Sequence, residues 1–168
     1  NVIAKLNFDE QSAFNLIHEG LHFAANDNIS VDAAHTHLST SLKDLQKLGV
    51  DAVTMTGIHN LDLGMGGAIN VATLPIFGDN NHDGILSVAE DNGASVSLNA
   101  NSSNQLHELA AFNNLDDKGI DSINIQFASN SELDAAFASN NSFAADVAAL
   151  NTSGLTTEFH LTDFQLQH

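Results

Sequence analysis

This chain lacks cysteine, arginine, tryptophan and tyrosine, and it contains a single proline. Without cysteine it can form neither a disulfide bond nor a thiolate metal site, so a secreted chain of this type must be held by its core and by bound ions. Basic residues are also scarce: four lysines face 21 acidic residues, and the formal net charge is −17 over 168 residues. Such a surface repels nucleic-acid phosphates and anionic membranes, so we expect neither as a partner.

No apolar run approaches the length of about 20 residues that spans a bilayer, so the sequence predicts no membrane insertion. Hydrophobic residues nevertheless make up 43% of the chain and include ten phenylalanines, which is enough for a packed core. Because no proline- or serine-rich linker divides the chain, we expect residues 1–168 to form a single domain. The opening residues Asn1-Val-Ile-Ala-Lys5 show neither a methionine nor a signal peptide, which favours a processed product or a fragment of a longer protein.

The most specific pattern runs from Asp79 to Glu90 and has the residue types of a twelve-residue EF-hand calcium loop. Oxygen donors occupy loop positions 1, 3, 5, 9 and 12, a glycine at position 6 permits the sharp turn, and Leu86 is an apolar anchor at position 8. Calcium is a hard cation that prefers about six to eight oxygen ligands. The pattern predicts a Ca²⁺ site with ligands from Asp79, Asn81, Asp83, the backbone carbonyl of Ile85, Ser87 and Glu90.

A simple polar turn is the alternative interpretation, because Asn, Asp and Gly are favoured in turns for backbone reasons alone. A turn requires neither the glutamate at position 12 nor the apolar residue at position 8, so we favour calcium. The approach over residues 70–78 indicates extended chain, and the exit from Ser87 to Asp91 supports barely one turn. Without a helix on each side, the loop resembles the free-standing calcium loops of extracellular modules such as dockerins rather than a calmodulin-type sensor.

A helical segment that ends in a glycine and leads into a short apolar strand occurs four times. The clearest copies are Leu42–Val53 and Leu106–Ile123, where helical spacing of apolar residues changes to alternate spacing after a glycine. The four glycines lie 29, 70 and 35 residues apart, which indicates a period of about 30 to 35 residues with one marker missing. The predicted fold class is α/β, with helix–strand units stacked as a short solenoid or small open sheet and an insertion carrying the calcium loop at about residues 60–100. An ordinary α/β domain, in which this junction is common, is the alternative.

Periodicity and capping residues place the individual elements. The predicted helices cover residues 9–19, 39–48, 104–113, 131–139 and 143–150. The predicted strands cover residues 2–7, 28–32, 50–54, 68–73, 94–98, 122–127 and 156–164.

Two stretches, Gly20–Val31 and His37–Val53, are similar to the repeated segments of very large acidic proteins that Gram-negative bacteria export by type I secretion. These RTX-type adhesins and surface-layer-like proteins typically lack cysteine, are rich in Asn, Asp, Ala and Gly, and fold outside the cell with calcium. The resemblance covers roughly residues 1–55 and 104–128 and implies an extracellular location at the bacterial cell surface. The glycine-rich RTX nonapeptide is absent, and its nearest approach is Asp62–Gly67, so the resemblance implies a segment outside the RTX repeats.

Nine histidines raise the alternative of an extracellular ligand-binding module for haem, a metal or a glycan. His35 and His37 are the best candidates, because alternate residues of a strand point to the same face. His18 and His22 lie four residues apart near a predicted helix end and form a second pair. The competing explanation is surface histidine in a chain that has few other basic residues.

Catalytic motifs are missing from the sequence. It has no Gly-x-Ser-x-Gly elbow, no His-Glu-x-x-His and no phosphate-binding glycine loop. Glu19 beside His18 and Glu108 beside His107 project to different sides of a helix and make poor catalytic pairs. We therefore expect a protein that is not an enzyme.

The hypothesis that follows is a calcium-stabilised structural or adhesive module of a secreted bacterial cell-surface protein. Its expected partners are copies of itself, in an extracellular fibre or layer, or a host or biofilm surface. Strand edges at residues 2–7 or 156–164 would supply the contact between copies.

Overall fold

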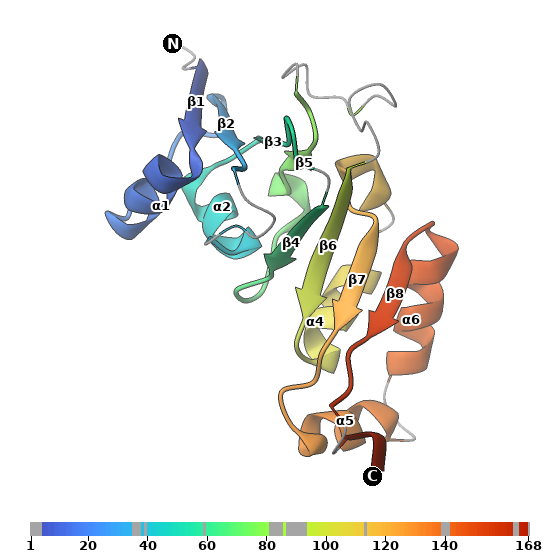
Figure 1. Ribbon diagram of the computed structural model, residues 1–168. Helices are drawn as coiled ribbons and strands as arrows, with labels where there is room; N and C mark the ends of the chain where they lie inside the picture. The colour runs from blue at the N-terminus through green and yellow to red at the C-terminus, as the bar shows by residue number, and fades with distance from the viewer. Residues whose placement is uncertain are drawn as a thin grey trace.

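The computed structural model describes residues 5–34, 38, 40–58, 60–80, 86, 94–112, 114–138, 142–162 and 165–167. Within these residues the chain forms eight strands, five α-helices and three short 3₁₀ helices (Figure 1). The predicted α/β class is therefore confirmed. In this described part, no helix is both long enough and apolar enough to span a lipid bilayer.

The strands form two four-stranded sheets in which every neighbouring pair is parallel. The two sheets lie beside one another, with β1 and β8 at opposite ends of the row of strands (Figure 1). Sheet A has the order β1 (Lys5–Asp9), β2 (Asn28–Asp32), β3 (Ala52–Thr54) and β5 (Ile76–Phe77). Sheet B has the order β4 (Asn60–Gly64), β6 (Ser95–Ala100), β7 (Ser122–Ile125) and β8 (Thr156–Phe159).

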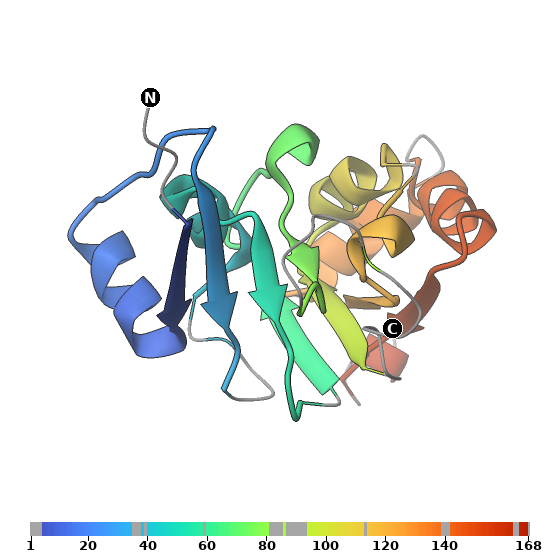
Figure 2. The same cartoon turned by 90° about the horizontal axis from the view of Figure 1, so that it is seen from above.

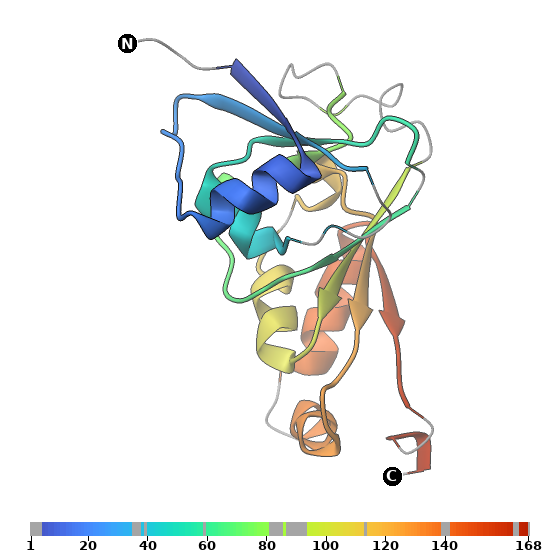
Figure 3. The same ribbon diagram turned by 60° about the vertical axis from the view of Figure 1, so that its left-hand side comes forward.

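Parallel neighbours need a crossover connection, and helices supply most of these connections. In Figure 2, α2, α4 and α6 follow one another along one side of the strands, and Figure 3 shows α4 packed against α6. The α-helices are α1 (Glu10–His18), α2 (Leu42–Leu48), α4 (Ser103–Ala110), α5 (Asn130–Phe137) and α6 (Phe143–Thr152). The 3₁₀ helices are η1 (Val71–Thr73), η2 (Asp116–Lys118) and η3 (Gln165–Gln167).

Apolar and polar side chains alternate along the strands, which gives each sheet one face toward the core. In β6, Val96, Leu98 and Ala100 are buried, and the polar residues between them are half-buried. Leucines of α2 and α4, including Leu45 and Leu106, are fully buried in the same region. The buried apolar residues of both sheets, apart from Ala52 of β3, belong to one hydrophobic cluster.

Polar side chains begin the helices, as expected from the sequence. The Ser12 N–H donates to Asp9 Oδ1 at 2.7 Å at the start of α1, and hydrogen bonds from Ser12 hold the pKa of Asp9 below its ordinary value. Hydroxyl groups of Ser41, Ser102 and Ser129 accept backbone N–H bonds at the starts of α2, α4 and α5. All five predicted helices occur, with ends within three residues of those expected.

The predicted strand over residues 68–73 is wrong, because residues 71–73 form the 3₁₀ helix η1. Asn70 explains the difference: its side-chain oxygen accepts the Ala72 N–H at 3.1 Å, and its backbone carbonyl accepts the Thr73 hydroxyl at 3.4 Å. Local bonds of this kind compete with strand pairing. The strands β4 and β5 were not predicted, and part of the predicted strand 2–7 lies outside the described residues.

Asp51 joins three strands of sheet A two residues after Gly49, the left-handed glycine that ends α2. Its N–H donates to the Ile29 carbonyl at 2.8 Å, and its Oδ2 accepts the Ile29 N–H at 2.9 Å. Its own carbonyl accepts the Ile76 N–H at 2.8 Å. A single aspartate before β3 therefore bonds to residues at the starts of β2 and β5 and aligns the starts of the three strands.

Asp121 makes the same set of bonds in sheet B, two residues after Gly119. Its N–H donates to the Val96 carbonyl at 2.9 Å, and its Oδ2 accepts the Val96 N–H at 2.7 Å. Its carbonyl accepts the Thr156 N–H at 3.0 Å. The two Gly-x-Asp segments recognised as a repeat in the sequence thus occupy equivalent positions in the two sheets.

The repeat length is not constant along the chain. Neighbouring strands are aligned with steps of 22 to 24 residues in sheet A, for example Lys5 opposite Asn28 and Ala52 opposite Ile76. In sheet B the steps are 25 to 35 residues. The expected period of about 30 to 35 residues is therefore wrong for sheet A, and the stacked-solenoid form of the fold stays a prediction.

We predict that Gly119→Ala destabilises the fold more than Gly20→Ala. Both glycines have left-handed backbones, with φ of +76° and +74°, but a Cβ at Gly119 would overlap the Phe77 carbonyl oxygen, whereas Gly20 faces open space. The shared backbone strain costs about 1–2 kcal/mol, and overpacking adds about 1–3 kcal/mol at Gly119 alone. Urea unfolding followed by circular dichroism measures both losses, and equal losses would contradict the close packing.

Candidate functional site

The predicted calcium loop leaves sheet A at the end of β5. The Gly78 N–H donates to the Val53 carbonyl at 2.8 Å, which continues the strand pairing one residue beyond β5. Asp79, at loop position 1, follows and is only 2% exposed. Asn80 Oδ1 accepts the Met55 N–H at 2.9 Å, so the start of the loop is attached to the residue after β3. The remaining predicted ligands lie outside the described residues: Asn81, Asp83, Ile85, Ser87 and Glu90.

Leu86, at loop position 8, lies against two glycines. A Cβ at Gly78 would be 3.3 Å from Leu86 Cδ1, and a Cβ at Gly119 would be 3.2 Å from Leu86 Cδ2. The leucine side chain therefore fills space that only glycine leaves open. This packing brings the middle of the loop against the end of β5 and against the segment that leads into β7.

The donor set of the loop fits a hard cation. All six predicted ligand residues offer oxygen atoms, and carboxylates from Asp79, Asp83 and Glu90 would supply the negative charge that calcium prefers. A buried carboxylate needs hydrogen bonds or a cation to offset its lost hydration, so the burial of Asp79 is compatible with a ligand role.

A groove of about 620 Å³ opens beside Asp79, with Asp27, Asp51 and Lys118 among its lining residues. Backbone groups engage two of its carboxylates: Asp51 accepts an N–H of β2, and Asp27 Oδ2 accepts the Ala24 N–H at 3.2 Å. Within the described ranges, no group of three or more His, Asp or Glu residues is arranged to hold a metal ion. The groove is a polar recess next to the loop, and Asp27 and Asp51 in its lining accept hydrogen bonds from backbone N–H groups.

The face of sheet B that points away from the core carries polar side chains in rows across the strands. The hydroxyl groups of Ser97 and Ser122 are 2.7 Å apart and share a hydrogen bond. Asn124 Nδ2 donates to Asn99 Oδ1 and to Asp62 Oδ1, both at 3.2 Å. These side chains link β4, β6 and β7 on the face opposite the apolar core.

Sheet A has a similar polar face. Asn7 Nδ2 donates to Asp32 Oδ2 at 2.7 Å, and the Ser30 hydroxyl donates to Asn7 Oδ1 at 2.8 Å. The Thr54 hydroxyl donates to the other oxygen of Asp32. Rows of side-chain hydrogen bonds therefore run across both sheets.

A shallow groove of about 760 Å³ lies over the polar face of sheet B. Its border includes Asp62 from β4, Asn124 from β7, Glu158 from β8 and His160 just beyond β8. His160 Nε2 lies 3.9 Å from Glu158 Oε2. The groove offers amides, hydroxyls and carboxylates that can bond to a polar ligand.

The structure brings one predicted histidine pair together. His18 and His22 border a pocket of about 550 Å³ at the end of α1, together with Asp44. His22 Nδ1 lies 2.6 Å from the Lys47 carbonyl oxygen, so this ring nitrogen is engaged by the backbone. Burial would raise the pKa of Asp44, but hydrogen bonds from Lys47 and Ser41 outweigh it, and the pKa lies below its ordinary value. His35 and His37 lie outside the described residues.

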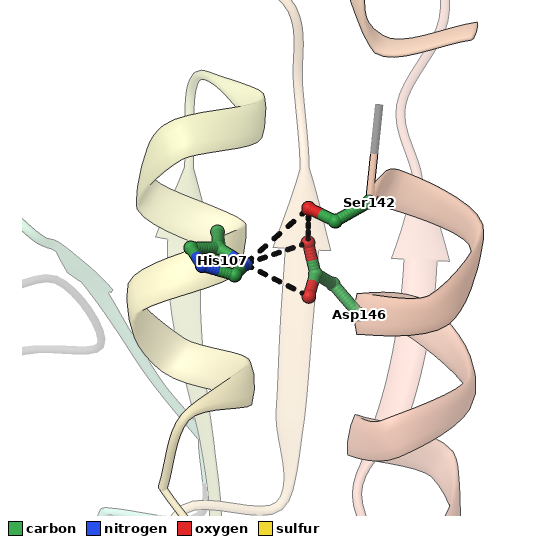
Figure 4. Close-up of polar contacts among 3 residues, drawn as sticks. All are labelled: His107, Ser142 and Asp146. Atoms are coloured by element: carbon green, nitrogen blue, oxygen red, sulfur yellow. Dashed lines mark hydrogen bonds and ion pairs between the residues drawn. The ribbon is translucent and has the colours of Figure 1, made fainter. Parts of the chain in front are cut away.

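A cluster that the sequence did not indicate joins α4 to α6 (Figure 4). His107 Nδ1 lies 3.0 and 3.1 Å from the two carboxylate oxygens of Asp146. The Ser142 hydroxyl lies 2.6 Å from Asp146 Oδ2 and 3.3 Å from His107 Nδ1. Asp146 is buried, whereas the His107 side chain is exposed.

These residue types are those of a serine hydrolase triad, but the geometry is different. In that triad the serine and the aspartate contact opposite nitrogens of the histidine ring. Here Ser142 and Asp146 both lie at Nδ1, and the serine hydroxyl donates to the carboxylate, so His107 is not placed to take the serine proton. The cluster instead ties the second turn of α4 to the first turn of α6. His107 and Asp146 are 39 residues apart, and no local pattern in the sequence marks them as partners.

No protein-family model, curated protein or solved structure matches this chain.

We predict that Asp146→Ala lowers the free energy of unfolding by about 1–3 kcal/mol, because it removes a buried acceptor of two side-chain hydrogen bonds. His107→Ala should cost less, since Asp146 keeps its bond from Ser142. Asp134→Ala, at an exposed position on α5, is the control and should stay within about 0.5 kcal/mol of the parent. Urea unfolding of the three variants tests this, and an Asp146→Ala variant as stable as the control would show that the cluster does not hold the helices together.

Proposed function

We propose that this chain is a calcium-stabilised structural module of a secreted bacterial cell-surface protein, serving adhesion or an extracellular fibre or layer. The proposal combines the calcium-loop pattern of residues 79–90 with the position of the loop in the fold. The loop runs from β5, the last strand of sheet A, to β6, the second strand of sheet B. A bound ion at this place would stabilise the segment that connects the two sheets.

The observation that carries the proposal is the placement of two loop positions relative to the packed sheets. Asp79 is buried where β5 ends, and Leu86 fills the space above Gly78 and Gly119. A polar turn on the surface would need neither contact. Because packing already holds the first ligand and the central anchor, the loop would lose less conformational entropy when it closes around an ion.

Each loop residue would have a separate role in binding the ion. Asp79 and the carbonyl of Ile85 would supply oxygens on either side of the glycine turn, and Glu90 would close the site with its carboxylate. Bound calcium would contribute two positive charges to a chain with a formal charge of −17. Because Glu90 lies five residues before β6, holding it near Asp79 restricts how far the two sheets can separate at this point.

An extracellular setting agrees with the composition. The chain has no cysteine, so outside the cell it has no disulfide with which to limit its unfolded state. Calcium sites of extracellular modules bind with dissociation constants of about 10⁻⁴ to 10⁻³ M, so they fill outside the cell and stay empty in a cytoplasm of low free calcium. Folding would then follow export.

We predict that saturating calcium raises the melting temperature of the parent chain and that Glu90→Gln removes most of this rise. At a concentration of about 100 times the dissociation constant, a ligand that binds only the folded state adds about 2.7 kcal/mol. For a chain of this size, that free energy corresponds to a rise of about 5–10 °C. Differential scanning calorimetry with calcium, with magnesium and with a chelator measures the effect.

Glu19→Gln is the matched control, because it makes the same charge change at an exposed position on α1's C-terminal side. It should respond to calcium like the parent. A melting temperature that is unchanged by calcium and by chelation in the parent chain would refute the proposal, and an equal response in Glu90→Gln would refute the ligand assignment.

A second candidate function is the binding of an extracellular polar ligand, and the groove over sheet B favours a glycan among the candidates. Its lining of Asp62, Asn124, Glu158 and His160 offers donors and acceptors for sugar hydroxyls. Sheets made only of parallel strands usually have both faces covered, so an open polar face on such a sheet is a place where a ligand can lie.

On this alternative, we predict that soluble oligosaccharides shift the backbone amide NMR signals of β4, β7 and β8 and that Asn124→Ala abolishes the shifts. Asn114→Ala, at an exposed position away from the groove, should leave them unchanged. Identical spectra with and without a broad panel of oligosaccharides would reject the glycan function.

A further inference from the structure

The large exposed apolar side chains of the described residues lie in two regions, one that includes the first strand, β1, and one that includes the last strand, β8. Six large hydrophobic side chains are 39% to 67% exposed, and none of them lies between residues 22 and 136. Three belong to β1, α1 and the residues just after it. The other three belong to β8, the strand at the opposite end of the row, and to α5 and η3, which lie beyond the arrowheads of sheet B (Figure 1). The six residues are Leu6, Phe14, Leu21, Phe137, Phe159 and Leu166. Exposed apolar groups gathered in this way mark contact surfaces.

The same two ends carry unpaired strand edges. Among the described residues, β1 pairs only with β2, and β8 pairs only with β7. Folded proteins usually protect such edges with proline, bulges, charges or a covering segment, and β8 has one charged residue, Glu158. At the β8 end, Phe159 packs on Phe143 with ring centroids 5.8 Å apart, and Phe143 packs on Phe137 at 5.2 Å. A buried aromatic core therefore continues outward to the free edge.

We propose that these ends bind each other, so that β1 of a second copy of this chain adds as a parallel strand beside β8. All strands within each sheet are parallel, and a further parallel strand continues that pattern. The contact joins two different surfaces, so each added copy presents a new free end, and the product is an open head-to-tail chain rather than a closed dimer.

The side-chain alternation of the two strands restricts how they can pair. Core-facing residues must meet core-facing residues, so the register can change only in steps of two. With the first residue of β1 opposite the first residue of β8, all four residues of β8 find partners. Phe8 of the second copy then lies beside Phe159, and Asn7 lies beside Glu158. In its own sheet Asn7 already donates one amide hydrogen to a carboxylate, that of Asp32, and a second hydrogen remains for Glu158.

Charge disfavours one of the two neighbouring registers, and the other leaves only two residues of β8 paired. A shift of two residues sets Asp9 of the second copy beside Glu158, and two carboxylates directly opposite each other on neighbouring strands repel. Repulsion between whole copies also acts, because each carries a formal charge of −17. Association should therefore strengthen with ionic strength, since screening shortens the range of this repulsion to about 3 Å at 1 M salt. The contact uses no residue of the calcium loop, so its test is independent of the calcium proposal.

The test is sedimentation velocity of the full chain over a range of protein concentrations at high ionic strength, with calcium present. The parent chain should move from monomer toward species of two and more copies as concentration rises. Leu6→Asp blocks the β1 end, and Phe159→Asp blocks the β8 end, so each variant alone should remain monomeric. Asn114→Asp adds the same charge at an exposed position outside both ends and should associate like the parent.

A mixture of the two blocked variants gives the decisive result. Phe159→Asp keeps an intact β1 end and Leu6→Asp keeps an intact β8 end, so an equimolar mixture should form a one-to-one dimer and stop there. Phe14→Asp and Phe137→Asp, at more peripheral exposed positions, repeat the experiment if either first variant has lost its circular dichroism spectrum. A monomeric parent at every concentration, a parent that stops at a dimer, or a mixture that stays monomeric would each overturn the head-to-tail contact.

Discussion

All strand pairs in the described part of this chain are parallel, and that constraint shapes the other features of the fold. All parallel strands begin at the same end of the sheet, so the chain must return to that end before the next strand can form. The connections that make this return are usually helical. Each return must then turn sharply into the next strand. Gly49 and Gly119 make this turn with left-handed backbones, and Asp51 and Asp121 bond to the neighbouring strands directly afterwards. The short junctions before β3 and β7 thus fix the direction of these strands and their alignment with the neighbouring strands.

Local signals explain the parts of the fold that the sequence predicted well. Helix starts are marked by a side chain that accepts a backbone N–H, as at Asp9 and Ser41, and helix ends are marked by glycine, as at Gly49. Residues 28–32 and 122–125 form strands as expected, because their apolar residues alternate between turn signals. These features depend on neighbours within a few residues, and a sequence displays such neighbours directly.

The errors arose where distant or competing contacts decide the structure. Residues 71–73 have strand-forming side chains, but the bonds made by Asn70 fold them into a turn. The strand β5 has only two residues, which is too short to show an alternating pattern, and its pairing with β3 identifies it as a strand. The His107–Asp146 contact joins helices that are separated in the chain by a 3₁₀ helix, a strand and another α-helix, so it is visible only in three dimensions. For the candidate site, the ligand pattern was readable from spacing alone, whereas the packing of Leu86 against two glycines required the fold.

The rows of polar side chains on the sheets have a chemical consequence. Asn124 of β7 bonds to two other strands through a single amide nitrogen, which donates to Asn99 on the adjacent β6 and to Asp62 on β4. Slow deamidation of this side chain would turn the donor into a carboxylate and set it against the carboxylate of Asp62. Deamidation of one asparagine would therefore weaken the side-chain bonds that join three strands.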